Sequence, residues 1–489
     1  MLEDLKVVLR DIGNLLLVLS ILAGLALIIP LIFDDKNDIM PLVYTVIVSA
    51  VAGLLLKYSC RTALEVELKH AMVIAALAWL IIPLFSIIPF LATGMSPLDS
   101  YFETMSGWTG TGFTLITHIS QSSHTIQFWR SFMQWIGGIG VVILLVTIIS
   151  RPGTSMYFLY KAEGREEKML PRIIKSVQWI WESYLILTLG GIALLFLLGM
   201  PLWDSINNVM TAIATGGFSI RDNGIEFYNS PWMEFGLMIV MLAGAMPFIV
   251  YHKMSRGKWR AIYEDVQVQT LIYVVILGVA ALTLENYLFY GSFFESLRIS
   301  SFQFISGLTT TGHQSTNIHN WSESAHLFLA AGMIIGGSAG STAGGIKLIR
   351  AAILYFGIGW WFRKIALPSR AVFSTKIGDK KYSEEEISGQ LREAALIMAL
   401  WLLFLFLGVV VLLHVAPPGY NLGEVIVEVA SAQSNVGLTT GLTTPDLSYI
   451  GKIMLILNMW IGRLEIIPII IFIRLLFSGF NPFSILIRK

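Results

Sequence analysis

The chain has 489 residues, of which 55% are hydrophobic and only 13% are charged. Because a soluble globular domain carries about 25% charged residues, this composition excludes an ordinary soluble fold and indicates that lipid contacts most of the surface. The formal net charge of +1 argues against a nucleic-acid partner, and the single cysteine, Cys60, excludes an intrachain disulfide.

Ten charge-poor runs are long enough to cross a bilayer as helices, which takes about 20 residues each. They lie near residues 12–33, 39–57, 70–92, 125–150, 180–200, 232–252, 266–288, 324–357, 390–415 and 448–476. The first run has 22 residues without a charge, which is long for the core of a signal peptide, so we expect a retained membrane helix. The sequence therefore predicts an all-α polytopic membrane protein that contacts lipid.

The basic residues predict the orientation, because cytoplasmic loops are enriched in lysine and arginine. Of the 33 Lys and Arg residues, two lie inside spanning runs and only five lie on the side opposite the majority. Those five are Lys36, Arg130, Arg221, Arg298 and Lys452. Ten crossings with both termini on the basic side satisfy this distribution, so we expect both termini to be cytoplasmic in a plasma (inner) membrane.

Four shorter apolar stretches, near 97–111, 202–215, 293–311 and 421–436, are too short to cross and are expected to be re-entrant. Each ends in a glycine-containing turn, and the four turns align on Gly112, Gly217, Gly312 and Gly437, at spacings of 105, 95 and 125 residues. This is an internal repeat of spanning helix, short helix, turn and spanning helix. We expect two N-terminal helices in 1–60, then repeats in 61–152, 153–255, 256–365 and 366–489.

An acidic residue opens the short stretch in three repeats, where a carboxylate complements the helix dipole. Asp99, Asp204 and Glu424 each lie 13 residues before the aligned glycine, whereas Glu295 lies 17 residues before Gly312. The third short helix therefore either is longer or starts differently.

The four turns have the composition of a cation filter. Non-helical backbone at membrane depth is tolerated only where protein buries it or water reaches it, and rings of backbone carbonyls can replace the hydration shell of a cation. The candidate filter residues are Thr109, Gly110, Thr111 and Gly112, then Thr215, Gly216 and Gly217, then Thr310, Thr311 and Gly312, then Asn435, Val436 and Gly437. The alternative for any single turn is an ordinary helix C-cap followed by a loop.

A glycine-rich run from Gly336 to Gly345 interrupts the eighth apolar run. We hypothesise an unwound loop beneath the filter that acts as a gate, and the alternative is a close helix–helix contact, because the glycines also have small-xxx-small spacing. The candidate gate residues are Gly336, Gly337, Ser338, Gly340, Ser341, Thr342, Gly344, Gly345, Lys347 and Arg463.

Two basic residues near this run have open roles. Arg463 lies inside the last spanning run, where a charge normally faces a cavity or a partner. It is interpreted either as a positive charge in the pore below the filter or as half of a structural ion pair. Lys347 either contacts the gate loop or extends to the cytoplasmic interface.

The four turns, the runs Gly137-Gly138-Ile139-Gly140 and 336–347, and Ile461-Gly462-Arg463-Leu464-Glu465 together resemble the Trk/Ktr/HKT superfamily of cation transporters, and within it the TrkH-type subunit. The resemblance covers essentially the whole chain. It implies a pseudo-fourfold potassium pore in one subunit, a homodimer, and regulation by a cytosolic TrkA-type ring that binds NAD, ATP or ADP. Potassium is then the substrate, held by filter carbonyls, and no covalently bound cofactor is expected.

Two residues depart from the family pattern. Gly110 stands where threonine is common, and His313 stands where an apolar residue is common. His313 could titrate at the outer mouth of the filter or be an exposed histidine without a function. In the plant branch, serine at the first filter glycine accompanies sodium transport, and Gly112 occupies that place here, so the resemblance favours potassium.

Two rival function classes remain. An alternating-access cotransporter, coupled to protons or sodium, usually shows inverted repeats, whereas each repeat here contains two crossings and is therefore parallel to the others. A membrane enzyme is disfavoured because no H-E-x-x-H, G-x-S-x-G or P-loop signature is present. We expect a transporter rather than an enzyme.

Overall fold

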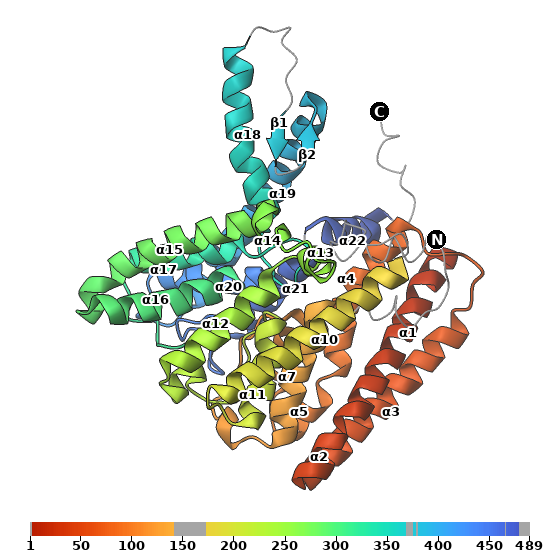
Figure 1. Ribbon diagram of the computed structural model, residues 1–489. Helices are drawn as coiled ribbons and strands as arrows, with labels where there is room; N and C mark the ends of the chain where they lie inside the picture. Colours follow the sequence, from red (N-terminus) through yellow and green to blue (C-terminus); the bar gives the residue numbers. More distant parts are fainter. Residues whose placement is uncertain (1, 141–172, 368–374, 378–379, 465, 479–489) are drawn as a thin grey trace.

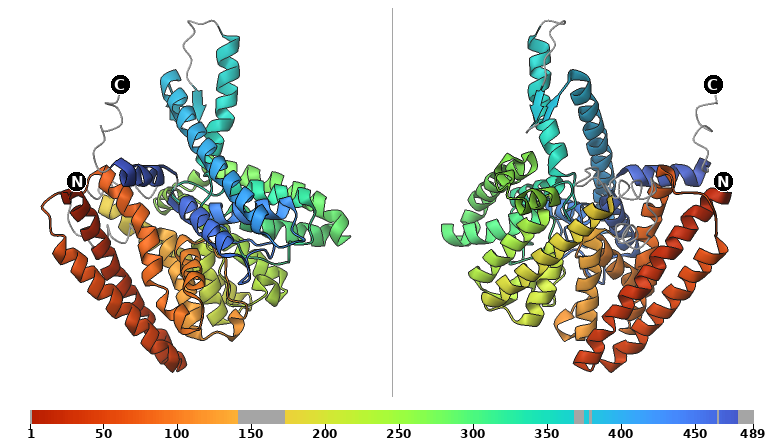
Figure 2. Two further views of the ribbon diagram at one scale, coloured as in Figure 1. Left: turned by 180° about the vertical axis from the view of Figure 1, so that it is seen from behind. Right: turned by 45° about the vertical axis from the view of Figure 1, so that its right-hand side comes forward.

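The computed structural model describes residues 2–140, 173–367, 375–377, 380–464 and 466–478. Within these ranges the chain is a bundle of helices, and the exception is a hairpin of two three-residue strands, β1 (Thr375–Ile377) and β2 (Lys380–Tyr382). Figure 1 shows the bundle with α18 and the start of α19 projecting beyond it at one end. The start of α1 and the helix α22 lie at that same end in Figures 1 and 2.

The N-terminal part forms a long hairpin along one side of the bundle (Figure 2). It consists of α1 (Leu2–Ala26), α2 (Ile28–Phe33) and α3 (Lys36–Ser59), and α1 packs against both α3 and α4. The two long helices touch through glycine: a Cβ added to Gly13 would lie 2.8 Å from the Gly53 carbonyl oxygen, and one added to Gly53 would lie 2.8 Å from that of Gly13. Small residues permit this backbone approach between membrane helices.

Each of the four repeats contains a first spanning helix, a short helix and a second spanning helix. The first spanning helices are α4 (Leu68–Phe85, continued by α5, Ile88–Ala92), α10 (Ile173–Leu197), α15 (Val266–Tyr290) and α19 (Glu384–Val415). The short helices are α6 (Pro97–Thr109), α11 (Leu202–Ile213), α16 (Phe293–Leu308) and α20 (Leu422–Ser434). The second spanning helices begin as α7 (His124–Ile139), α12 (Pro231–Ala245), α17 (Glu323–Ile335) and α21 (Tyr449–Leu464).

A serine stands immediately before each second spanning helix, and its hydroxyl accepts a hydrogen bond from a backbone N–H of the first turn. The serines are Ser123, Ser230, Ser322 and Ser448. Serine is a favoured N-cap because it satisfies one of the otherwise unpaired amides. The short helix of the third repeat has 16 residues against 12 or 13 in the others, so the displaced Glu295 marks a longer helix.

The second spanning segments of the last three repeats are broken into two helices each, so the runs 232–252 and 448–476 are not the single helices that hydropathy predicted, and the expected interruption of 324–357 is present. Six helices are long and apolar enough to cross a membrane, or up to eight if each of two bent pairs is one span, among the described residues. The predicted runs 232–252, 324–357 and 448–476 each divide, with α12 meeting α13 (Phe248–Ser255) at 95° and α21 meeting α22 (Ile466–Ser478) at 111°. The predicted run 125–150 holds α7, and its part beyond 140 lies outside the described residues.

Proline and glycine account for two of these breaks, those after α12 and α17. Pro247 follows Met246 directly after α12, and proline cannot donate the amide that a continuing helix requires. Gly336 follows α17 with a φ of 72°, in the left-handed region that favours glycine. Between α17 and α18 (Leu348–Ala366), residues 336–347 form an irregular loop that we call the glycine-rich loop.

The contact between α1 and α3 gives a first prediction. Gly13→Val should lower the thermal unfolding temperature of the purified protein, because the side chain would overlap the α3 backbone, and overpacking of this kind costs about 1–3 kcal/mol. Gly24→Val on the same helix is the matched control, since no atom lies within 4 Å of an added Cβ there. Equal unfolding temperatures for the two variants would contradict the described packing.

Candidate ion pathway

The four glycine turns, far apart in the sequence, meet in one closed ring. A Cβ added to Gly112 would lie 2.1 Å from the Gly216 carbonyl oxygen, and one added to Gly217 would lie 2.1 Å from that of Thr311. The next two contacts close the ring: a Cβ added to Gly312 would lie 1.7 Å from the Val436 carbonyl oxygen, and one added to Gly437 would lie 2.1 Å from that of Thr111. Each glycine therefore contacts the carbonyl of the next turn, in the order one, two, three, four, one.

The contacts have fourfold regularity. Each approached carbonyl belongs to the residue directly before the aligned glycine of its own turn. The four aligned glycines all have positive φ, between 74° and 95°, and so do the residues two places earlier: Gly110, Thr215, Thr310 and Asn435, between 53° and 72°. Gly110, the departure from the family pattern, thus adopts the same left-handed conformation as the three side-chain-bearing residues at its position.

The short helices end at the ring. α6 ends at Thr109, α11 at Ile213, α16 at Leu308 and α20 at Ser434, so each C-terminus directs unpaired carbonyls and the negative end of its dipole toward the turns. The ring residues from Thr109 to Thr111, from Thr310 to Gly312 and from Asn435 to Gly437 are buried, and Gly112 is half-buried. The arrangement offers a cation backbone oxygens and partial negative charge without a carboxylate in the turns.

Side chains tie the ring to its surroundings. Asn435 donates from Nδ2 to Thr111 Oγ1 (3.0 Å) and to the Met459 carbonyl (2.9 Å), and this links turn four to turn one. Gln134 of α7 donates from Nε2 to the Gly216 carbonyl (2.6 Å) and accepts from the Phe218 amide (3.0 Å), so a residue of the first repeat holds turn two. Gln134 was not among the residues predicted from the sequence.

A set of buried polar residues on the short helices braces the turns from behind, and the sequence analysis missed it. We call the residue nine places before each aligned glycine the brace position; its occupants are Glu103, Asn208, Gln303 and Glu428. Glu103 Oε2 accepts from the Leu115 amide (3.0 Å), and Glu428 Oε2 accepts from the equivalent Thr440 amide (3.0 Å).

The third brace residue makes the same contact. With its amide oxygen turned inward, Gln303 accepts from the Ser315 and Thr316 amides at 3.0 and 3.2 Å. A shared spacing of nine residues before the aligned glycine was the signal that could have revealed these side chains in the sequence.

The glycine-rich loop lies directly against the ring. Gly344 donates from its amide to Thr310 Oγ1 (2.8 Å), and its Cα lies so close to turn four that an added Cβ would be 2.1 Å from the Ser434 carbonyl oxygen. Thr342 donates from Oγ1 toward the Ile213 and Gly244 carbonyls (both 2.9 Å). Because residues 336–347 are not helical, the alternative of a helix–helix contact is wrong for this run.

The ends of this loop are paired with each other. The amides of Ile346 and Lys347 donate to the carbonyls of Ile334 and Ile335, both at 3.0 Å. A Cβ added to Gly336 would lie 2.3 Å from the Gly344 oxygen. The loop therefore begins and ends at the same place, where the end of α17 lies beside the start of α18. It contains the predicted gate residues Gly337, Ser338, Gly340, Ser341 and Gly345.

Arg463 joins the loop to the first repeat. Its guanidinium donates to the Thr342 carbonyl (3.3 Å) and to the Gly137 and Gly138 carbonyls, and it lies 5.1 Å from the centre of the Trp79 ring. Lys347, at the start of α18, has a φ of 81°. The structure brings Arg463 and Thr342 together, whereas the pore role of Arg463 and the role of Lys347 stay predictions.

His313 is not at an exposed mouth, so that expectation is wrong. Its side chain is fully buried, and its Nε2 lies 3.3 Å from Thr211 Oγ1 on the neighbouring short helix α11. Its backbone carbonyl accepts from Ser306 Oγ at 2.7 Å. Since it directly follows Gly312, His313 packs turn three against the second repeat instead of facing the solvent.

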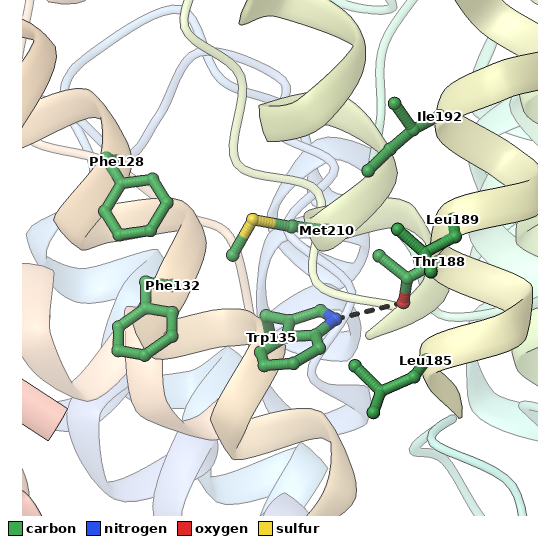
Figure 3. Close-up of a pocket in the computed structure, with 8 residues that line it drawn as sticks. All are labelled: Phe128, Phe132, Trp135, Leu185, Thr188, Leu189, Ile192 and Met210. Carbon is green, nitrogen blue, oxygen red and sulfur yellow. Dashed lines mark hydrogen bonds between the residues drawn. The ribbon is translucent and has the colours of Figure 1, made fainter. Parts of the chain in front are cut away.

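A cleft of about 250 Å³ lies between α7, α10 and α11 (Figure 3). Its lining is Phe128, Phe132, Trp135, Leu185, Thr188, Leu189, Ile192 and Met210. The one polar contact drawn there is Trp135 Nε1 to Thr188 Oγ1, at 3.1 Å. An apolar cleft offers no ligands to a cation, and no group of three or more His, Cys, Asp or Glu in the described part could hold a metal ion.

The TrkH family of cation transport proteins matches residues 39–481, and the chain belongs to that family. An uncharacterized cation transporter of Methanocaldococcus jannaschii is 32% identical over 97% of this chain and 96% of its own. The Trk system potassium uptake protein TrkH of Salmonella typhimurium is 28% identical over 83% of this chain and 85% of its own. The crystal structure of the potassium transporter TrkH from Vibrio parahaemolyticus has a TM-score of 0.82, with 25% identity over 96% of this chain and 98% of that one.

The ring contacts give a second prediction. Gly312→Ser should reduce potassium flux by at least tenfold or abolish its preference over sodium, because the new Cβ would overlap the Val436 carbonyl. Gly419→Ser is the matched control: Gly419 also has a positive φ, of 110°, but no atom lies within 4 Å of an added Cβ. Radioactive rubidium uptake into proteoliposomes measures both. Normal selective flux in the Gly312 variant would argue against the ring as the conduction path.

Proposed function

We propose that the chain takes up potassium across the plasma membrane through the ring of four glycine turns. The observation that carries the proposal is the closure of the ring, in which every aligned glycine lies against the carbonyl of the next turn. Carbonyls fixed around one axis replace the hydration shell of a dehydrated cation. The relatives named as potassium uptake proteins support potassium as the ion.

The selectivity proposal rests on backbone oxygens. The four turns contain no acidic residue, so a divalent cation would find no carboxylate ring there. Glycine at position 112 in the first turn favours potassium by its resemblance to the potassium-transporting members. A sodium-permeable pore, or transport coupled to protons or sodium, is the alternative function.

Gating is proposed to reside in the glycine-rich loop. The loop contacts turn three through Gly344 and turn four through the approach of Gly344 to Ser434. These contacts support a loop that obstructs an ion leaving the ring. Arg463 connects the loop to the glycine carbonyls of α7, and its positive charge would oppose a cation at that level. Displacement of the loop would then open the path, with Lys347 at its junction with α18.

We further propose a homodimer with both termini in the cytoplasm and a cytosolic nucleotide-binding ring of the TrkA type as regulator. The end of the bundle from which α18 projects also carries the start of α1, which is consistent with this orientation (Figure 1). The projecting helices pack through Trp360 of α18 and Ile387 of α19, and Lys364 of α18 also pairs with Glu384 of α19 at 2.8 Å. A cytosolic partner would meet this projection first.

Growth at limiting potassium tests the function. In a bacterium that lacks its own potassium uptake systems, the wild-type chain with a TrkA-type partner should restore growth, and Gly312→Ser should not, whereas Gly419→Ser should. Immunoblots of the membrane fraction establish equal amounts of the three proteins. Absence of rescue by folded wild-type protein would contradict potassium uptake and would direct the next measurement to sodium flux.

Arg463 gives a separate prediction about gating. Arg463→Ala should raise cation flux several-fold in the absence of the partner, because it removes both the positive charge and the tie to Thr342. Arg463→Lys is the control, since it keeps the charge but cannot reproduce the forked contacts, and its flux should stay near the wild-type value. If both variants lose folded protein instead, Arg463 is a structural residue and not part of the gate.

A further inference from the structure

Glu428 of α20 is a buried acidic residue that has no part in the ion binding proposed above. Its side chain is fully buried at the brace position of the fourth repeat. Each of its oxygens is occupied: Oε1 accepts from Thr439 Oγ1 (2.8 Å), the Thr443 amide (3.0 Å) and the Thr443 hydroxyl. Oε2 accepts from the Thr440 amide (3.0 Å) and the Thr440 hydroxyl (3.2 Å).

This environment suits an ionised carboxylate. Burial opposes the charge, but two backbone amides and three hydroxyls surround it, and hydrogen bonds to the charged form favour that form. The two backbone amides can only donate, so Oε1 and Oε2 must each accept, and an ionised carboxylate accepts through both oxygens. A protonated acid would have to give its own proton to one of the crowding hydroxyls.

Except for Glu295, which is exposed, the other acidic residues of the short helices have basic partners. Asp99 is paired with Lys452 (2.6 Å), Glu103 with Arg130 (2.7 Å) and Asp204 with Arg221 (2.7 Å). Glu424 lies 2.5 Å from His319 Nδ1. Glu428 forms no ion pair with any lysine, arginine or histidine of the described residues.

The brace positions therefore differ in charge, although Glu103, Gln303 and Glu428 make the same contact with the backbone beyond their glycines. Asn208 instead donates to Tyr228 Oη at 3.3 Å. Glu103 is neutralised by Arg130, whose guanidinium also donates to the Ser219 carbonyl of turn two (2.9 Å). Asn208 and Gln303 are neutral amides. Among the four brace residues, Glu428 is therefore the acidic residue without a basic partner. It contacts Thr439 and Thr440, two and three residues beyond the ring glycine Gly437.

We propose that Glu428 is the electrostatic determinant of cation affinity in the ring: an ionised, unpaired carboxylate behind turn four that raises cation occupancy without touching the ion. The inference rests on the proposed function of the ring. Three extended residues span about 10 Å, so the carboxylate lies within reach of the ring through protein, where a unit charge is only partly screened. Glu428 is thus a positioning residue for turn four and a source of fixed charge.

The equivalent Gln303 shows how the two roles can be separated, because it makes the brace contacts without a charge. Glu428→Gln should keep turn four in place and raise the half-saturating potassium concentration roughly tenfold, equivalent to about 1.4 kcal/mol. The preference for potassium over sodium should persist, since the carbonyl ring is unchanged. The double variant Glu428→Gln with Gln303→Glu should return the half-saturating concentration toward the wild-type value, because it moves the charge to the neighbouring brace position.

The measurement is made on purified full-length protein in detergent. The unfolding temperature is followed against potassium concentration at constant ionic strength, with choline as the replacing cation, so that binding is read without transport. An unchanged half-saturating concentration in Glu428→Gln would overturn the proposal, as would a failure of the double variant to regain affinity. If Glu428→Gln does not fold, Gln303→Glu alone decides: it should lower the half-saturating concentration, and no change refutes the inference.

The same titration separates this inference from the proposed function. Potassium-dependent stabilisation of the wild type, equal in Glu428→Gln, would leave the ring as a potassium site and reject Glu428 as its determinant. A wild-type protein that no potassium concentration stabilises more than choline does would overturn both.

Discussion

The structure depends on the absence of four side chains. At Gly112, Gly217, Gly312 and Gly437 an added Cβ would lie 1.7–2.1 Å from a carbonyl oxygen of the next turn. No other amino acid permits that approach, and the positive φ of each glycine excludes most of them independently. Because every glycine contacts the next turn in the same sense, the four turns position each other, and the ring is defined only when all four are present.

Tightly packed turns of this kind need support from outside the ring, and the short helices provide it. Glu103, Gln303 and Glu428 hold the backbone three residues beyond the glycines of turns one, three and four, while Gln134 and Asn435 tie one turn to elements of another repeat. Backbone amides in a low-dielectric interior are costly when unpaired, so the brace oxygens stabilise a backbone that no helix or sheet could satisfy. The glycine-rich loop closes the ring from the other side through Gly344.

The sequence predicted the repeat and the short helices because both depend on features local to a segment: the glycines of a turn and the length of an apolar run. It failed where the decisive contacts are distant in sequence. Hydropathy treated 232–252 as one helix although Pro247 follows Met246, and it treated 448–476 as one helix although α21 and α22 meet at 111°. The glycine-rich run was expected to interrupt 324–357, and residues 336–347 are not helical. Glu428 escaped notice because a polar residue in a short helix resembles a solvated face, and only the packing of Thr439, Thr440 and Thr443 around it reveals its burial.

The unequal occupants of the brace positions illustrate what a single chain permits. In a pore assembled from four identical subunits, any substitution is introduced four times, and intermediate charge states of a ring are inaccessible. Here Glu103, Asn208, Gln303 and Glu428 occupy one geometric place with different chemistry. Duplication within one gene thus lets evolution adjust ion affinity in single steps of one charge while the backbone symmetry that holds the ion is retained.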